Sequence, residues 1–276
     1  MDESLDLAIW QVAAAYVFIL IVLAIFRIKK IPREKLIVIS VLRMTFQLIL
    51  VGYILVYIFD NPHPALTLGI IFFMLGFAIF NVYQRAKASL NFPLKKMIAA
   101  GMILGVTISL AYMMLVVLNL DPWYNVRIFI PIGGMIIGKT MTGVALAVNY
   151  LITGMKEQRE KVEGALMLGA TPKQASKPIM NEAFDSAMLP TINAMVGMGI
   201  VFLPGMMTGQ IIAGQEPLTA VKYQIAVMLG VSGTVSITVL IFLHLAYKTF
   251  FNEHKQFILN KREVASDEIP IKNKTN

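Results

Sequence analysis

The chain has 276 residues, of which 57% are hydrophobic and only 14% are charged, and its formal net charge is +8. Soluble globular proteins carry about 25% charged residues. The apolar residues here come in runs of about twenty, the length that crosses a bilayer. These values exclude an ordinary soluble protein. The chain has no cysteine, which excludes a disulfide framework and a thiolate metal site, and its acidic start, MDESLD, predicts no cleaved signal peptide.

Hydropathy predicts an all-α, polytopic membrane protein with about seven transmembrane helices in a single domain, residues 1–276. The expected spans are 7–26, 36–59, 65–81, 97–118, 126–150, 187–204 and 220–247. Lys and Arg concentrate in the connections 27–35, 85–96 and 152–186 and in the tail from Lys248. Cytoplasmic connections are enriched in these residues, so the N-terminus is predicted outside and the C-terminus inside a plasma membrane, which is the inner membrane in a bacterium. This bias accounts for the net charge without a nucleic-acid-binding surface.

The stretch GGMIIGKT, residues 133–140, matches the phosphate-binding pattern G-x-x-x-x-G-K-[ST] at every fixed position. A working P-loop follows a buried strand and opens a helix in a soluble α/β domain. Here the match lies inside one apolar run of membrane length, so we expect no nucleotide site in it. The pairs Gly134/Gly138, Gly101/Gly105 and Gly205/Gly209 instead have the spacing that lets two membrane helices approach closely.

The connection 152–186 is the longest one between predicted spans, and it is expected on the cytoplasmic face. Its first half has the pattern of an amphipathic helix, which Gly169 is placed to end. Thr171 then looks like an N-cap, with Pro172 at the first helical position and Gln174 closing a capping box. Such a helix, break and helix fits either an interfacial segment or a docking element for a soluble partner. The polar stretch 262–276 is expected to be a disordered tail.

The segment EGALMLG, residues 163–169, resembles the EAA motif of ABC-transporter permeases. Glu163, Ala165, Gly169 and, further on, Ile179 fit that motif, whereas Gly164 replaces its central alanine. Asn-Glu stands at 181–182 where the motif has Leu-Pro. Together with 189–214 and 220–229, the segment closely resembles the iron-export ABC permease family (FetB-like), which is related to plant permeases associated with aluminium tolerance and possibly nucleotide-sugar transport.

The resemblance implies a permease half-transporter that is not itself an enzyme and holds no cofactor. A separate ABC ATPase would bind ATP and Mg²⁺, and two permeases would assemble with two ATPases. In such complexes a cytoplasmic coupling helix fits into a groove on the ATPase. By position, the coupling helix and the turn after it would consist of Glu163, Gly164, Ala165, Gly169, Thr171 and Pro172.

Candidates for the transport pathway are polar, ionisable or sulfur-containing residues in or beside the predicted spans. Ionisable residues inside a membrane are functional candidates by default, although Lys139 could also snorkel or bind backbone carbonyls. Methionine thioethers suit soft metals, but methionine also fills irregular cores without any ligand role. The candidates are Arg43, Gln47, Lys139, Asn193, Met195, Met198, Pro204, Met206 and Met207.

The resemblance predicts iron as the substrate, but the charges do not support iron independently. Ferrous iron favours carboxylate and imidazole ligands, and no Asp or Glu falls inside a predicted span, so no metal ligand is assigned. If both line the pathway, Arg43 and Lys139 would repel a bare cation; the alternatives are that they face helix carbonyls or serve an anionic substrate, such as a metal chelate or a nucleotide sugar. A seven-helix receptor and a secondary transporter are the alternatives from other classes. The connection 152–186 disfavours the receptor, and no inverted repeat supports the transporter.

Overall fold

The computed structural model describes residues 8–86 and 90–258 and is built from helices. In chain order the helices are α1 (Ile9–Ala15), α2 (Val17–Ile28), α3 (Glu34–Asp60), α4 (Pro64–Arg85), α5 (Phe92–Tyr112), the π-helix η1 (Met113–Val117), α6 (Val126–Glu157), α7 (Arg159–Met167), α8 (Pro172–Gly197), α9 (Gly205–Ile212), α10 (Pro217–Ala246) and the 3₁₀-helix η2 (Tyr247–Phe250). Two isolated bridges are the only β-type pairings in the described part of the chain. The all-α class predicted from hydropathy is therefore confirmed.

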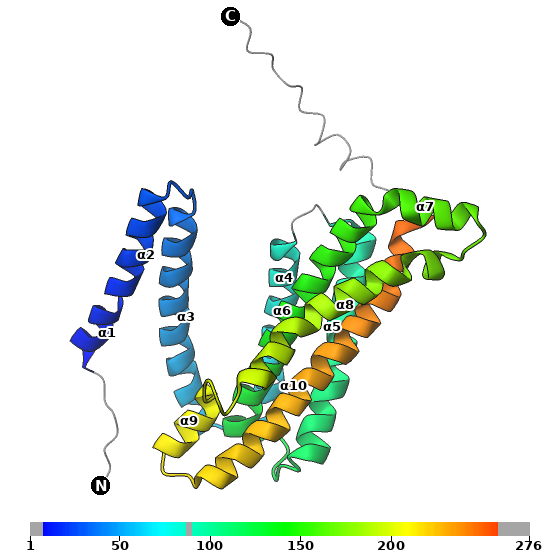
Figure 1. The fold of residues 1–276 in the computed structure, drawn as a ribbon. Helices are drawn as coiled ribbons and strands as arrows, with labels where there is room; N and C mark the ends of the chain where they lie inside the picture. The colour runs from blue at the N-terminus through cyan, green and yellow to red at the C-terminus, as the bar shows by residue number, and fades with distance from the viewer. Residues whose placement is uncertain (1–7, 87–89, 259–276) are drawn as a thin grey trace, which may run out of the picture.

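Six segments of the described chain are helices long and apolar enough to cross a membrane: 9–28, 34–60, 64–85, 92–117, 126–157 and 217–250. Each corresponds to one of the predicted spans. Helix α1 begins at one end of the molecule and α10 finishes at the other, where α7 also lies (Figure 1). The predicted orientation, N-terminus outside and C-terminus inside, stays a prediction, and the predicted tail 262–276 lies outside the described residues.

The sixth predicted span, 187–204, is wrong in its boundaries. Helix α8 begins at Pro172 and ends at Gly197, and residues 198–204 form a non-helical connection to α9. With 26 residues, α8 is about 39 Å long at 1.5 Å per residue, and it runs between the two ends of the bundle (Figure 1). The connection 152–186 is correspondingly not a loop, because it comprises the end of α6, all of α7 and the first half of α8.

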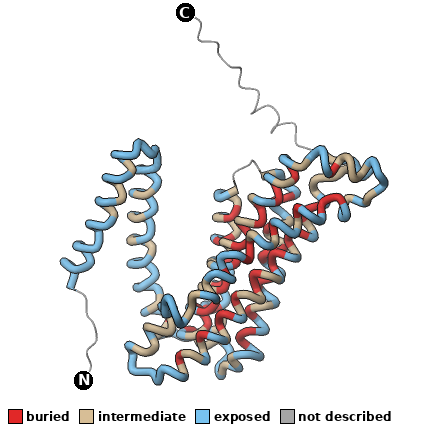
Figure 2. The backbone as a smooth tube through the Cα atoms, in the orientation of Figure 1, coloured by how far each residue is buried: buried red, intermediate tan, exposed pale blue. Residues whose placement is uncertain are grey.

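Helices α4 to α10 form a bundle that holds almost all buried residues, whereas α1, α2 and α3 stand apart as a hairpin (Figure 2). Within the bundle, α6 packs against α4, α8 and α10, and α5 packs against α10. Ile58 is the one residue of the hairpin that is buried. The molecule is thus a packed core of helices with an apolar hairpin beside it (Figure 1).

Glycine allows the closest helix contacts of the bundle, as the spacing Gly101/Gly105 predicts. A Cβ on Gly105 would lie 2.7 Å from Cα of Thr238, and one on Gly101 would lie 3.0 Å from Cβ of Phe242. Both contacts join α5 to α10. The other two pairs differ, because a Cβ on Gly138, Gly205 or Gly209 would meet nothing within 4 Å.

The P-loop-like stretch 133–140 is helical throughout, in the middle of α6. Backbone N–H groups inside a helix bond to carbonyls four residues earlier, so they cannot cradle a phosphate. The residues of this stretch serve helix packing instead, since a Cβ on Gly133 would lie 2.5 Å from Cδ1 of Ile71 on α4.

Candidate transport pathway and coupling surface

The turn between α7 and α8 is built by backbone hydrogen bonds around Gly169. The N–H of Gly169 donates to the carbonyl of Leu166 (3.0 Å), and the N–H of Ala170 donates to that of Ala165 (3.0 Å). This pair of bonds is a Schellman motif, which needs a residue in the left-handed region. Gly169 supplies it with φ +90°, so glycine ends the helix where the sequence places it.

Helix α8 starts with a complete capping box. The N–H of Gln174 donates to Oγ1 of Thr171 (3.3 Å), and the N–H of Thr171 donates to Oε1 of Gln174 (2.9 Å). Pro172 occupies the first helical position, where its missing N–H has no partner to lose. The turn is therefore held from both sides, and the direction of α8 relative to α7 is set by local chemistry.

Helix α7 presents one apolar corner to the solvent. Val162 is buried, and Ala165 and Leu166 pack on the core of the bundle. Met167 and Leu168 are 87% and 92% exposed at the tip of the turn. Large apolar side chains on an exposed turn are typical of a surface that contacts a protein or a membrane.

Beside this apolar corner, the carboxylate of Glu163 forms an ion pair with Arg159 one turn earlier on α7. Nε of Arg159 donates to Oε1 of Glu163 at 2.8 Å, with both side chains partly exposed. Exposed i, i+4 pairs contribute about 0.3–0.5 kcal/mol, so this pair orders the two side chains rather than stabilising the fold. The predicted docking residues Glu163, Gly164, Ala165, Gly169, Thr171 and Pro172 thus lie on α7, on the turn after it and at the start of α8.

Two pathway candidates lie on the outlying hairpin rather than in the bundle. Arg43 is exposed on α3, with its guanidinium carbon 5.1 Å from the centre of the Phe77 ring on α4. Gln47 is partly buried one turn further along α3. The contact with Phe77 is a cation–π interaction, which gives Arg43 a packing role in this structure.

Lys139 lies near the middle of the membrane-spanning part of α6. Nδ2 of Asn149 donates to the carbonyl of Arg85 at 3.3 Å, so Asn149 is level with the end of α4. The 22 residues of α4 span about 33 Å, close to the thickness of a bilayer core. Lys139 precedes Asn149 by ten residues, or about 15 Å. Its side chain is exposed from the bundle at that depth.

Asn193 lies at a similar depth on α8. The carbonyl oxygen of Ala187 is 3.3 Å from the position of a Cβ on Gly143, and Ile179 lies beside Gly154. Helices α6 and α8 are therefore antiparallel neighbours. Beyond the contact at Gly143, Lys139 is about 6 Å further along α6 and Asn193 about 9 Å further along α8, in the same direction. The structure thus brings these two candidates to one level of adjacent helices.

The sulfur-containing candidates are spread over the end of the bundle opposite α7. Met195 is partly buried on α8, and Met198 follows that helix and accepts a hydrogen bond from Nε2 of Gln224 (3.8 Å). Pro204 precedes α9, which carries Met206 and Met207, both partly buried. Met206 packs against the core. These methionines come from the end of α8, the connection after it and α9, and their role as metal ligands stays a prediction.

Two carboxylates that were not predicted to lie in a transmembrane span are on the exposed face of α8. Glu182 accepts a hydrogen bond from Nε2 of Gln158 at 3.5 Å, and Asp185 follows three residues later. The prediction missed them because it started the span at 187, fifteen residues after α8 begins. The capping residues at 171–174 and the small or branched residues at 175, 179, 183 and 187 were the available signal for one continuous helix. No group of three potential metal-binding side chains occurs in the described ranges.

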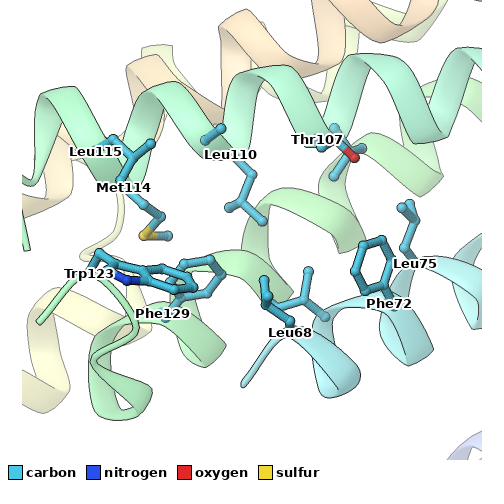
Figure 3. Close-up of a pocket in the computed structure, with 12 residues that line it drawn as sticks. Leu68, Phe72, Leu75, Thr107, Leu110, Met114, Leu115, Trp123 and Phe129 are labelled. Atoms are coloured by element: carbon cyan, nitrogen blue, oxygen red, sulfur yellow. The ribbon is translucent and has the colours of Figure 1, made fainter. Parts of the chain in front are cut away.

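The pocket between α4, α5 and the start of α6 has an apolar lining (Figure 3). It encloses about 150 Å³, and Leu68, Phe72 and Phe129 are among its walls. Among the side chains that line it, those of Thr107 and Trp123 carry an oxygen or nitrogen atom. A charged substrate would find no counter-charge there, so this pocket is not a candidate site for a metal or an anion.

The apolar helices, their length and the buried bundle define a multi-pass α-helical membrane protein. The chain belongs to the family described as "Uncharacterised protein family (UPF0014)", whose model matches residues 9–251. It is 34% identical over 260 residues to the "Probable iron export permease protein FetB" of Escherichia coli (strain K12), covering 94% of this chain and 96% of the relative. The predicted resemblance is thus confirmed.

Two further relatives extend the comparison to other organisms. The chain is 34% identical over 245 residues to "UPF0014 membrane protein YjkA" of Bacillus subtilis (strain 168), covering 89% of this chain and 96% of that one. It is 32% identical over 244 residues to "Protein ALUMINUM SENSITIVE 3" of Arabidopsis thaliana, covering 88% of each chain. No solved structure matches the chain.

Proposed function

We propose that this chain is the permease subunit of an ABC transporter and that it exports a metal, with iron as the first candidate. A separate ATPase subunit binds ATP and Mg²⁺, two copies of each subunit assemble, and the complex acts in the plasma membrane. Closure of the ATPase dimer moves the permease between inward-open and outward-open states, whose populations ATP binding shifts. The similarity to a relative named as a probable iron export permease supports the choice of substrate.

The observation that carries the proposal is the exposed turn that follows α7. Met167 and Leu168 protrude beyond the core, and Gly169 and Thr171 hold the backbone around them. An exposed apolar corner on a rigid support suits insertion into a groove of a soluble partner. Because α8 continues from this turn to Gly197, a displacement of the turn moves a helix that reaches membrane level.

A second substrate class is favoured by the basic residues. Lys139 lies at mid-membrane depth, and such a charge suits an anionic cargo, such as a metal chelate or a nucleotide sugar, better than a bare cation. The two carboxylates of α8, Glu182 and Asp185, favour a cation instead. Iron is therefore the first candidate and an anionic complex the second.

The test of the proposal uses the permease purified together with its ATPase and reconstituted in liposomes. We expect the two chains to co-purify and ATP hydrolysis to rise when Fe²⁺ is supplied. Glu163→Lys places two basic side chains side by side on α7 and should abolish the Fe²⁺-stimulated part of the hydrolysis. The variant should still insert in the membrane, because residue 163 lies outside the membrane-spanning part.

A charge swap is the matched control. The double variant Arg159→Glu with Glu163→Arg restores the intrahelical ion pair but reverses the positions of the two charges. If docking needs the carboxylate at 163, the double variant stays uncoupled; if α7 only needs the ion pair for its own order, coupling returns. Full coupling in both variants, or failure of the chains to co-purify, would contradict the proposed function.

A further inference from the structure

Helices α5 and α10 pack tightly at one level of the membrane and part from each other toward the end of the bundle opposite α7. A Cβ on Gly105 would lie 2.7 Å from Cα of Thr238, so the two backbones touch at that level. At Gly230, about two turns earlier on α10, the nearest atom to such a Cβ is Sδ of Met113 at 2.9 Å. There a long side chain bridges the two helices. Beyond their closest contact, the helices therefore leave a groove between them.

This groove, which we call the α5–α10 groove, has a volume of about 750 Å³. That volume lies within the range of about 300–1,000 Å³ that ligand sites in proteins occupy. Its exposed apolar walls include Ile108, Val117, Ile225, Leu229 and Ile237. Val117 belongs to the π-helix η1, and π-helical turns are rare and frequently mark functional sites. The groove therefore has the size and the lining of a site for a long apolar molecule.

Two glycines of α10 keep the groove open along its length. Gly230 and Gly233 both line it. A Cβ on Gly233 would meet nothing within 4 Å, whereas one on Gly230 would press on Met113. An apolar chain can therefore lie against the backbone of α10 at Gly233, and a larger side chain at that position would take its place.

A single cation stands at the open end of the groove. Among the described residues that line the groove, Lys222 alone is charged, and its side chain is exposed. No ion pair of Lys222 occurs in the described ranges. Helix α10 begins near Lys222, at Pro217, and finishes at the end of the bundle where α7 lies (Figure 1). The ammonium group of Lys222 is therefore available to a ligand at the end opposite α7.

The length of α10 places Lys222 at the level of the lipid headgroups. The 30 residues of α10 span about 45 Å, which exceeds the bilayer core of about 30 Å. The first turns of the helix therefore lie at the membrane boundary, where a lysine keeps its charge in water. From Lys222 to Ile237 the groove follows α10 for about 22 Å, whereas one leaflet of the core is about 15 Å thick. An acyl chain that starts at the headgroups thus fits within it.

We propose that the α5–α10 groove binds one anionic phospholipid, with its phosphate on Lys222 and an acyl chain along Gly233. Basic residues beside membrane helices attract anionic lipids, and an ammonium group binds a phosphate through charge-assisted hydrogen bonds. A zwitterionic lipid fits the apolar walls equally well, but its own cationic group repels Lys222. The bound lipid fills the space between the parted ends of α5 and α10 and stabilises the native bundle by mass action.

The test is a titration of the purified, delipidated chain in detergent, followed by native mass spectrometry. The two probes are phosphatidylglycerol, which is anionic, and phosphatidylcholine with the same acyl chains, which has no net charge. We expect one tightly bound phosphatidylglycerol, with an affinity about fivefold higher than that of phosphatidylcholine, since one lysine near an anionic headgroup contributes about that factor.

Two variants change the groove, and each has a matched control outside it. Lys222→Gln should remove the preference for phosphatidylglycerol. Its control, Arg127→Gln, removes an exposed basic side chain at the start of α6 that contacts Phe59 instead. Gly233→Leu should weaken the binding of both lipids, because the new side chain fills the groove without meeting protein atoms. Its control, Gly52→Leu, adds the same side chain to the hairpin. Both controls should bind phosphatidylglycerol as the unchanged chain does.

Three results would overturn the proposal. The first is an equal affinity for the two lipids in the unchanged chain, and the second is an unchanged preference in Lys222→Gln. The third is a dimer in the mass spectrum that Gly233→Leu abolishes while lipid binding persists, because a second chain would then occupy the groove. The experiment uses neither the ATPase nor Fe²⁺, so its outcome is independent of the test with Glu163→Lys.

Discussion

Helices α2 and α3 are as apolar as α4 and α10, but the structure uses the two pairs differently. The best windows of 9–28 and 34–60 have mean hydropathies of 2.5 and 2.0 and contain no buried residue. Those of 64–85 and 217–250 both reach 2.3, with 33% and 44% of residues buried. Inside a membrane, lipid is as apolar as a leucine side chain, so hydropathy does not decide which helices pack together.

Glycines that let neighbouring helices pack closely account for the difference in burial between the bundle and the hairpin. The bundle has glycines where a partner helix comes close, at Gly105, Gly143 and Gly154, whereas a Cβ on Gly52 in α3 would meet nothing within 4 Å. Close backbone approach gives a helix pair its dispersion contacts and its specificity. The hairpin lacks such contacts with the bundle, so its side chains remain available to lipid or to other proteins.

The largest expected effect comes from filling a close contact in the bundle. Gly105→Leu should disrupt the packing of α5 on Thr238 of α10 and destabilise the protein by about 1–3 kcal/mol or more. Gly52→Leu makes the same change on the hairpin and should leave stability unchanged. The measurement is the temperature at which each variant loses its monodisperse peak in detergent. Equal losses would show that the hairpin is as tightly packed as the bundle.

The second effect concerns the turn after α7. Gly169→Ala should cost about 1–2 kcal/mol, because an alanine at φ +90° brings Cβ too close to the following carbonyl. Gly164→Ala is its control: space is open at both positions, but only Gly169 has the left-handed backbone. Hydrogen exchange of the amides at 165–170 should rise in the first variant and not in the second. Unchanged exchange in both would mean that the Schellman motif does not hold the turn.

A smaller effect is expected at the start of α8. Thr171→Ala removes the hydroxyl that caps the N–H of Gln174 and should cost about 1 kcal/mol. Lys173→Ala, in the same first turn and exposed, should cost much less. Amide exchange of the first turn of α8 measures both. A cap that contributes nothing would give two indistinguishable profiles.

The smallest effect on stability is expected for substitutions of Arg43, which lies on the hairpin, and Lys139, which lies on the bundle. Arg43→Gln on the hairpin and Lys139→Gln on the bundle change exposed side chains and open no cavity in the core, so both variants should stay folded. Transport should separate them. If Lys139 lines the path and Arg43 does not, Lys139→Gln changes the ratio of Fe²⁺ to chelated iron transported, while Arg43→Gln leaves that ratio unchanged. A change caused by Arg43→Gln alone would move the pathway to the hairpin.

Much of the fold follows from the sequence, because membrane spans and helix caps have local causes. Six spans and the start of α8 at Thr171 and Pro172 are readable from hydropathy and from capping chemistry. The extent of α8 is not, since it carries Lys177, Glu182 and Asp185 on one face and packs Ile179 and Ala187 on the other. A hydropathy window averages over both faces of the helix, so a helix that is apolar on one side only has a low mean hydropathy and is not recognised as a membrane span.

The candidate site was harder to predict than the fold. The sequence indicates Lys139 and Asn193 individually, but their common depth depends on the contacts of Gly143 and Gly154 with α8. Those contacts join residues more than twenty positions apart, and nothing in the local pattern specifies them. The separate position of the hairpin could not be predicted from the sequence either, because its helices are as apolar as those of the bundle.

Helix α8 has a mechanical property that follows from its two internal prolines. Pro178 and Pro190 lack an amide hydrogen, so the carbonyls of Gln174 and Ser186 receive no bond from the residue four positions later. Helix α8 therefore bends more easily at these two prolines than a continuous α-helix of the same length would. A displacement of α8 at Thr171 is therefore taken up partly by bending of the helix. Pro190 lies about two turns beyond Glu182 along the helix, and the bend there determines how far Asn193 moves.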